Sequence, residues 1–173
     1  MAQLKTQQVR VEMPESGFSG ALYANRVYVK LVDGHFLIEF SRTEGEGSTF
    51  VAACFLEGNN VKQNEQEWKG YLKKLARASG EMVELLEKDA SDNESRVISK
   101  NPAQIQFANV CRFAQRDQTA ETRFFCLSVG AAIDAAQGKR QTVVAQPVLW
   151  VFTPVLEQAR LIVKLYELLE EQS

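Results

Sequence analysis

Apolar residues are concentrated most strongly near the end of the chain. The run from Val148 to Phe152 is continuously apolar, as in a buried strand, and a helical pattern with one polar stripe begins at Val155. Between them stand Thr153, a candidate N-cap, and Pro154, whose fixed φ suits the first turn of a helix. Outside its polar stripe this helix is more widely apolar than an ordinary surface helix. The pattern therefore predicts a helix buried against a sheet on one side and against a second element or subunit on another.

The first half of the chain contains a predicted β-hairpin. Residues 22–32 and 35–43 form two strand-like runs, joined by Asp33-Gly34, and both turn residues tolerate the positive φ of a type I′ turn. A two-residue turn fixes the register, because the residues on either side of it must lie opposite each other. Counting back from the turn places six apolar side chains on one face, which we expect to face the core: Val27, Val29, Leu31, Phe36, Ile38 and Phe40.

Other elements of the first half surround this hairpin. Residues 7–12 indicate a short strand before it, and a polar, glycine-rich loop is expected at residues 44–48. Residues 49–56 form a continuous apolar run, which is typical of a strand at the centre of a sheet. A helical pattern then covers residues 64–88, with a bend or break expected near Ser79-Gly80.

The second half shows a similar order of elements. Strands are predicted at residues 105–113, 122–129 and 142–152, and Pro147 suits an edge strand or a bulge. A polar loop is expected at residues 115–121 and a loose or briefly helical segment at 131–139. The terminal helix then closes this half.

The two halves suggest a duplicated architecture. Both open with a similar tripeptide, Tyr23-Ala24-Asn25 in the first and Phe107-Ala108-Asn109 in the second. We therefore predict an α+β fold of duplicated β-β-β-α units, with two antiparallel sheets packed through two helices. The predicted organisation is one compact domain made of a first unit at residues 1–90, a linker at 91–102 and a second unit at 103–173.

Composition places the chain among ordinary globular proteins. Hydrophobic residues make up 45% of its 173 residues, and no apolar run approaches the roughly 20 residues that a transmembrane helix needs. The polar start MAQLKTQQ lacks the pattern of a signal peptide. We expect a soluble protein without a membrane partner, inside the cell, in the cytoplasm, the nucleoid or an organelle matrix.

Charge is unevenly distributed along the chain. The net charge is −2, but residues 81–94 carry −5 and residues 167–171 carry −3, so the rest of the chain carries +6. A local basic surface can therefore exist on a protein of nearly neutral total charge.

The sequence offers little catalytic or metal-binding chemistry. His35 is its only histidine, so a serine or cysteine nucleophile would lack a histidine base. The cysteines, Cys54, Cys111 and Cys126, have no metal-ligand spacing and lie in apolar runs, which is typical of buried reduced thiols. We therefore predict no catalytic residues, no metal site and no cofactor, and an enzyme of unrecognised type is the minor alternative.

Two groups of residues suggest binding instead. Arg26, Tyr28 and Lys30 alternate along one strand and share the face opposite the apolar one, so two cations flank an aromatic ring. Such a face can stack a base and neutralise the neighbouring phosphates. Arg112 and Arg123, beside two phenylalanines, offer a similar mixture in the second half. The alternative interpretation is that these faces are simply polar and solvated, as antiparallel sheets allow.

Part of the second half resembles a known group of proteins. The run from Arg123 to Val129, RFFCLSV, is followed by a loop with glycine and lysine, a strand, and a long helix after Thr153-Pro154. This resembles the Whirly family and its relatives, the mitochondrial guide-RNA-binding proteins and the Pur-type proteins. The lysine-glycine-lysine signature of the Whirly proteins is absent, and Gly20-Ala21-Leu22 is only a faint echo of it. The resemblance implies single-stranded DNA or RNA bound across sheet surfaces, with helices that pack the sheets and mediate oligomers.

Two functional hypotheses follow. The first is non-catalytic binding of single-stranded RNA or DNA by the sheet faces, with five candidate residues: Arg26, Tyr28, Lys30, Arg112 and Arg123. The second is a structural or assembly protein that forms homo- or hetero-oligomers through its apolar C-terminal helix. Its interface would include three leucines of that helix: Leu161, Leu165 and Leu168.

Overall fold

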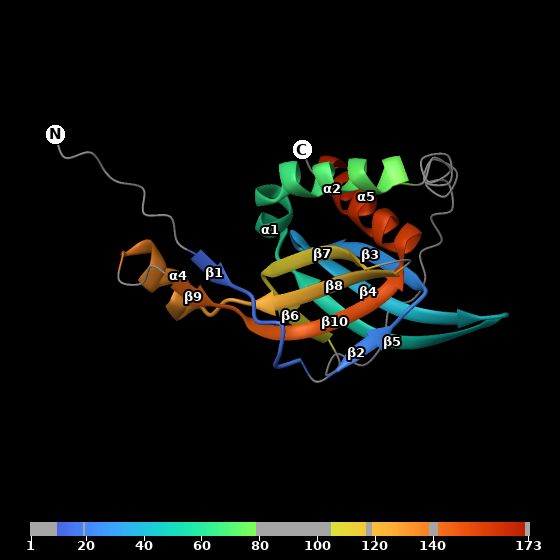
Figure 1. Ribbon diagram of the computed structural model, residues 1–173, viewed down its shortest axis with the longest axis horizontal. Helices are drawn as coiled ribbons and strands as arrows, with labels where there is room; N and C mark the ends of the chain where they lie inside the picture. The colour runs from blue at the N-terminus through green and yellow to red at the C-terminus, as the bar shows by residue number, and fades with distance from the viewer. Residues whose placement is uncertain (1–9, 19, 79–104, 117–118, 139–141, 172–173) are drawn as a thin grey trace.

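The computed structural model describes residues 10–18, 20–78, 105–116, 119–138 and 142–171. Two four-stranded sheets lie face to face, with α2 and α5 along one side and a small two-stranded sheet projecting from one end (Figure 1). The first half contains β1 (Arg10–Glu12), β2 (Ala21–Tyr23), β3 (Arg26–Val32), β4 (His35–Glu44), β5 (Gly47–Leu56), α1 (Gly58–Gln63) and α2 (Glu65–Ala78). The second half contains β6 (Ile105–Ala108), β7 (Val110–Arg116), β8 (Thr119–Cys126), α4 (Val129–Ala136), β9 (Thr142–Val144), β10 (Gln146–Pro154) and α5 (Val155–Glu171).

The first sheet has the strand order β3-β4-β5-β6. The hairpin prediction is confirmed together with its register, since Val32 pairs with His35 and every apolar pair follows in step. Asp33 and Gly34 have φ values of 50° and 80°, as a type I′ turn requires. The prediction of a central third strand is also confirmed, because β5 lies between β4 and β6. The loop expected at residues 44–48 is shorter than predicted, since β4 runs to Glu44 and β5 begins at Gly47.

The second sheet has the strand order β2-β10-β8-β7. Pro147 lies at a register shift between β10 and β8, so the predicted bulge is confirmed. β10 is nevertheless an interior strand with β2 on its other side, and residues 142–144 form the separate strand β9. The loop expected at 115–121 is mostly strand, because β7 continues to Arg116 and β8 begins at Thr119.

Two runs predicted as single strands are each divided between the two sheets. β2 pairs in parallel with β10 of the second sheet, whereas β3, only a few residues later, belongs to the first. In the same way β6 pairs in parallel with β5 of the first sheet, whereas β7 belongs to the second. Each half of the chain thus contributes one short strand to the sheet built mainly by the other half. The sheets are therefore mixed and not purely antiparallel.

An asparagine stabilises the chain at each of these crossings. The side chain of Asn25 donates to the carbonyl of Thr43 at 2.9 Å and accepts from its N–H at 2.7 Å. Asn109 makes the same two bonds with Leu127, at 2.8 and 2.7 Å. Both partners lie 18 residues further along the chain. The residue before each asparagine is a fully buried alanine, so the two crossings have the same local structure.

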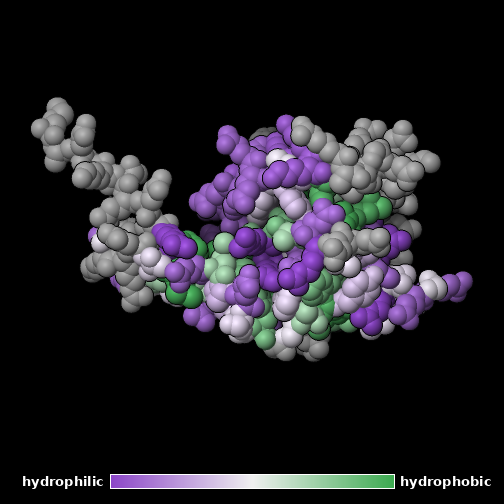
Figure 2. Space-filling model, in the orientation of Figure 1, coloured by the Kyte–Doolittle hydropathy of each residue, from purple (hydrophilic) through white to green (hydrophobic). Residues whose placement is uncertain are grey.

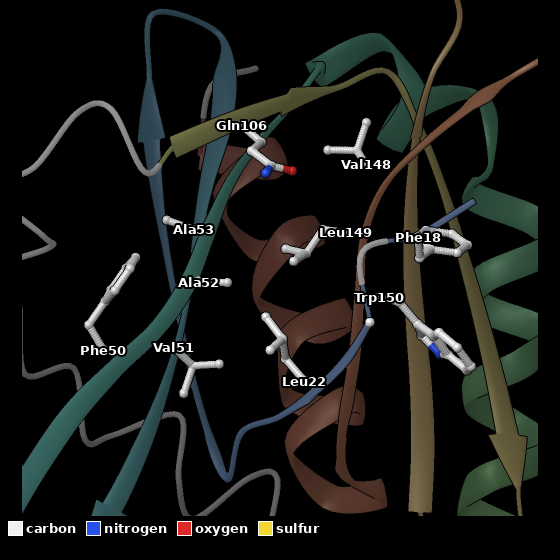
Figure 3. A pocket seen from close by; sticks show the side chains of 11 residues that line it. Phe18, Leu22, Phe50, Val51, Ala52, Ala53, Gln106, Val148, Leu149 and Trp150 are labelled. Atoms are coloured by element: carbon white, nitrogen blue, oxygen red, sulfur yellow. The ribbon is translucent and has the colours of Figure 1, made fainter. Parts of the chain in front are cut away.

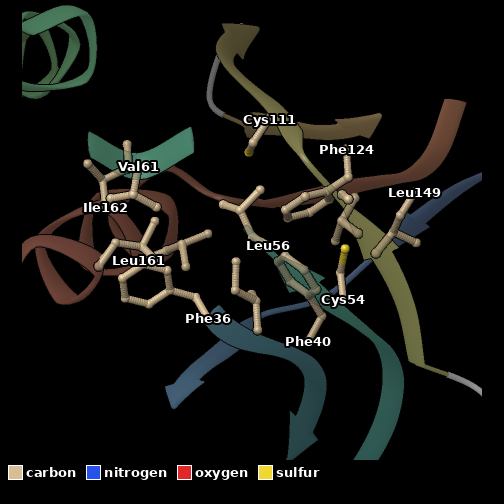
Figure 4. Close-up of a cluster of buried hydrophobic side chains, with 14 of the residues drawn as sticks. Phe36, Phe40, Cys54, Leu56, Val61, Cys111, Phe124, Leu149, Leu161 and Ile162 are labelled. Carbon is tan, nitrogen blue, oxygen red and sulfur yellow. The ribbon is translucent and has the colours of Figure 1, made fainter. Parts of the chain in front are cut away.

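The inner faces of the two sheets form one hydrophobic core (Figure 4). Phe40 of the first sheet contacts Phe124 of the second, with ring centroids 5.9 Å apart. Leu161, Ile162 and Leu165 of α5 are buried in the same cluster. Because this cluster draws on both halves of the chain, neither half has a complete core of its own.

The start of α5 differs from the prediction. β10 continues through Pro154 and the helix begins at Val155. The hydroxyl of Thr153 is buried without a hydrogen-bond partner, so the prediction that Thr153 caps the helix is wrong. Thr153 instead pairs with Ala120 across the sheet, and strand pairing determines its conformation.

The α+β class is confirmed, with more of the described residues in strands than in helices. The helix predicted from residue 64 is present as α2 up to Ala78, and α1 precedes it. Its continuation to residue 88, the bend near Ser79-Gly80 and the linker at 91–102 lie outside the described residues.

Candidate nucleic-acid interface

The outer face of the second sheet combines arginine and aromatic side chains. Strand register places Arg112 of β7 opposite Arg123 of β8, and Arg123 opposite Trp150 of β10, so the three form a row across the sheet. Phe152 and Tyr23 follow on the same face, on β10 and β2. We call this surface the arginine-aromatic face and define it by five residues: Tyr23, Arg112, Arg123, Trp150 and Phe152.

Close contacts order the centre of this face. The guanidinium carbon of Arg123 lies 4.7 Å from the centroid of the Trp150 ring, within the range of a cation–π interaction. The ring of Phe152 is 5.2 Å from that of Trp150. Phe18, from the segment before β2, packs against both Trp150 and Phe125. Its ring centroid lies 5.8 Å from that of Trp150 and 5.4 Å from that of Phe125. The arginine and the rings therefore form one packed layer.

Positive charge exceeds negative charge over this sheet. Its strands contain three arginines and a single carboxylate, Glu121. Glu121 is buried and lies 3.3 Å from Arg123 and 3.5 Å from Arg116. Within the described residues no ion pair involves Arg112, which is exposed. In Figure 2, hydrophilic residues gather over β7 and β8, which is where these cations lie.

The first sheet differs from the second in its balance of positive and negative charge. Arg26, Tyr28 and Lys30 share the outer face of β3, as their register predicts. Tyr28, however, pairs with Glu39, whose carboxylate is buried in the same face. Arg26 lies 3.8 Å from Glu157 of α5, so part of the positive charge on this edge strand is compensated within the protein.

The two predicted groups of binding residues lie on different surfaces. Arg112 and Arg123 are brought together on the second sheet, whereas Arg26, Tyr28 and Lys30 lie on an edge strand of the first. Sequence reasoning missed Trp150 and Phe152 as face residues, because the run from Val148 to Phe152 suggested burial on both sides. Their alternation with Leu149 and Val151, which point to the core, was the available signal.

A cleft of about 370 Å³ lies between β5 and β6 of the first sheet and β2 and β10 of the second. Figure 3 shows Leu22, Ala52 and Leu149 around its centre and the amide of Gln106 at its upper end. Of the described residues that line it, none has a titratable side chain. Among the described residues, no cluster of three or more His, Cys, Asp or Glu side chains is arranged to hold a metal ion.

The buried thiols are also unsuited to chemistry. Cys54 and Cys111 lie in the core between the sheets (Figure 4), and all three cysteines are free. Burial raises the pKa of the Cys54 thiol and of the Cys111 thiol far above the ordinary range, and proximity of the two reinforces the rise for Cys111. Both thiols are therefore protonated near neutral pH and are poor nucleophiles.

The three leucines proposed for an oligomer interface are mostly covered within one chain. Leu161 and Leu165 are buried in the core, and only Leu168 is partly exposed. The width of the apolar surface on α5 is explained by contacts with β3, β8 and β10 and with α2. An oligomer therefore needs a different surface from the one defined by Leu161 and Leu165.

Comparisons of the chain with protein-family models, with curated proteins and with solved structures found no match. Within the described residues, no helix combines the length and the apolar character needed to span a bilayer.

Proposed function

We propose that this chain is a non-catalytic protein that binds single-stranded DNA or RNA across its sheet faces, chiefly the arginine-aromatic face. The observation that carries the proposal is the row of Arg112, Arg123 and Trp150 across three neighbouring strands. Aromatic rings and guanidinium planes stack unpaired bases, and exposed cations neutralise the phosphates that join them. A duplex hides the faces of its bases, so single strands are the preferred ligand.

The expected energies favour a salt-sensitive interaction. Stacking of one base contributes about 1–3 kcal/mol. For a single strand, each neutralised phosphate makes the plot of log K against log salt steeper, adding about 0.7 to the size of its negative slope. Arg112 is the cation best placed for a phosphate, because it is exposed and has no carboxylate partner among the described residues. Arg26, Tyr28 and Lys30 provide a second, weaker surface on the first sheet.

The duplicated architecture implied by the Whirly resemblance belongs to the same proposal. It is supported by the matched bonds of Asn25 and Asn109, at the same separation of 18 residues. It is supported as well by the reciprocal positions of β2 and β6, each added in parallel to the third long strand of the other half. Two equivalent units would present two outer faces, of which the second is the more positive.

A role in protein assembly, as a homo- or hetero-oligomer, is the second candidate function. The observation that favours it is the exposure of apolar side chains on the unit formed by β1, β9 and α4, which projects from one end of the molecule (Figure 1). Ile133 is 48% exposed and Val144 is 49% exposed there. A monomeric protein at micromolar concentration, measured by light scattering, would argue against a homo-oligomer.

Fluorescence anisotropy tests the leading proposal. Labelled single-stranded DNA, single-stranded RNA and duplex of about 20 nucleotides are titrated with protein over a series of salt concentrations. We expect a preference for single strands and an affinity that falls as salt rises. Absence of binding to every oligonucleotide at low salt would refute the proposal and favour assembly.

Two charge-neutralising variants locate the binding face. Arg112→Gln and Lys30→Gln each remove one exposed cation, from the second and first sheet respectively. We expect Arg112→Gln to reduce the salt slope by about 0.7 and Lys30→Gln to reduce it less. A larger effect of Lys30→Gln would move the interface to the first sheet. Unchanged affinity in a combined Tyr28→Ala, Lys30→Ala variant would exclude the face of β3.

A further inference from the structure

Tyr23 and Arg42 form a composite surface where the two sheets meet. Tyr23 ends β2 of the second sheet, and its side chain is among the most exposed apolar groups, at 44%. Arg42 belongs to β4 of the first sheet, yet its guanidinium carbon lies 5.6 Å from the centroid of the Tyr23 ring. The same guanidinium donates a hydrogen bond to the Tyr23 carbonyl at 3.1 Å. The cation is therefore held over the ring by a backbone contact between sheets.

The charge of Arg42 is not compensated within the described residues. No carboxylate among these residues lies within ion-pair distance of it, although Glu44 follows on the same strand. A guanidinium has five N–H donors, and the bond to Tyr23 uses one of its nitrogens, so donors remain for an anion. The partly exposed ring and the cation together suit a ligand that has both a flat aromatic part and a negative charge.

We propose that Tyr23 and Arg42 form a subsite for one nucleotide of a bound single strand. The base stacks on the exposed part of the Tyr23 ring, and the adjacent phosphate accepts hydrogen bonds from Arg42. This inference rests on the proposed function, and it extends the path of the strand. Tyr23 shares a face with Phe152 and Trp150, so the bound nucleic-acid strand passes from the arginine-aromatic face to the junction of the sheets.

The second half of the chain supplies a natural control. The matched asparagine bonds make Phe107 the counterpart of Tyr23, and they make Cys126 the counterpart of Arg42. Phe107 is 49% exposed, so its ring is as accessible as that of Tyr23. Its ring centroid lies 6.4 Å from that of His35, and none of the guanidinium groups among the described residues lies over it. Removal of the Phe107 ring should therefore affect binding much less than removal of the Tyr23 ring.

The test uses the full chain and a labelled single-stranded oligonucleotide, with anisotropy measured across a salt series. Tyr23→Thr and Phe107→Thr remove each ring and keep a residue that favours strands. We expect Tyr23→Thr to weaken binding about fivefold or more without a change in salt slope, and Phe107→Thr to weaken it less than twofold. We expect Arg42→Gln to reduce the salt slope by about 0.7, and Arg42→Lys to retain it.

The outcomes separate this subsite from the proposed function. If the unmodified protein binds no oligonucleotide, both proposals fall. If it binds, but the two threonine variants behave alike and Arg42→Gln leaves the slope unchanged, only the subsite is refuted. Thermal unfolding of each variant checks the fold, because Arg42 also joins the sheets; should one variant unfold, the other substitution decides on its own.

Discussion

Gln158 is a buried polar residue that joins three elements. Its amide nitrogen donates to the carbonyl of Glu121 at 2.7 Å and to the hydroxyl of Thr122 at 3.2 Å. Its amide oxygen accepts a hydrogen bond from the hydroxyl of Tyr71 on α2. The side chain is completely buried, so water cannot replace any of these partners.

Replacement of Gln158 by leucine should destabilise the protein although the volume is conserved. The change removes the hydrogen-bond acceptor of the Tyr71 hydroxyl and one donor to the carbonyl of Glu121, at a cost of about 1–3 kcal/mol. Gln66→Leu, on the exposed surface of α2, is the matched control and should change the free energy of unfolding by less than about 0.5 kcal/mol. Urea denaturation measures both, and equal midpoints for the two variants would contradict the role of Gln158.

Buried titrating groups give the protein a predictable response to alkali. Burial raises the pKa of Tyr71 to about 12, and it also raises the pKa values of Tyr166, Cys54 and Cys111. The folded state therefore binds these protons more tightly than the unfolded state does. Their contribution to stability is complete below the unfolded pKa values, about 8.5 for Cys and 10 for Tyr, and is lost as pH rises toward the folded values.

The free energy of unfolding should consequently fall between about pH 9 and pH 11. Urea midpoints at pH 8, 9, 10 and 11, measured with a reductant present, give the slope. Tyr71→Phe removes one of the groups and should flatten the decline above about pH 10. A midpoint that is the same at pH 8 and pH 11 would show that these groups titrate alike in both states.

At the scale of the elements, Asn25 and Asn109 hold equivalent crossings between sheets. Each side chain makes two hydrogen bonds to the backbone of a residue 18 positions later. Asn25→Ala and Asn109→Ala should each cost about 1–3 kcal/mol, because two backbone groups lose their partners. Asn59→Ala, on an exposed position of α1, provides the control. A large loss from one variant and none from the other would contradict the equivalence of the crossings.

Local signals explain which elements were predictable from the sequence. The Asp33-Gly34 turn fixes its hairpin through backbone dihedral angles alone, so the register of β3 and β4 could be predicted to the residue. The crossings at Ala24 and Ala108 could not be predicted, because an apolar run looks the same whether it stays in one sheet or enters another. Only long-range pairing with β10 and β5 distinguishes these cases.

The candidate site, too, depends on long-range strand pairing that the sequence does not reveal. Arg112 and Arg123 could be predicted as candidate binding residues, whereas the alignment of Arg123 with Trp150 depends on the pairing of β8 with β10. Arg42 and Tyr23 belong to different sheets, so no pattern within either strand indicates their contact. Leu161 and Leu165 show that a widely apolar helix does not by itself indicate an interface with another subunit, since the sheets of the same chain can cover it.

At the scale of the whole molecule, the exchange of β2 and β6 makes the two halves interdependent. β2 has its strand partner in the second half, β6 has its partner in the first, and the hydrophobic core draws on both. Each half alone would expose an unpaired edge on β5 or β10 as well as the inner face of its sheet. The halves should therefore fold together and not separately.

A divided chain tests this interdependence. Residues 1–96 and 97–173, separated within the predicted linker at 91–102, can be produced alone or together with an affinity tag on one fragment. We expect the tagged fragment to retain the other in equal amount, and the pair to show one cooperative thermal transition. The isolated fragments should lack such a transition as monomers, because each lacks the residues that the other half contributes to the shared core. A monomeric fragment that unfolds cooperatively would show that its half is an independent domain, and the exchanged strands would then contribute little to stability.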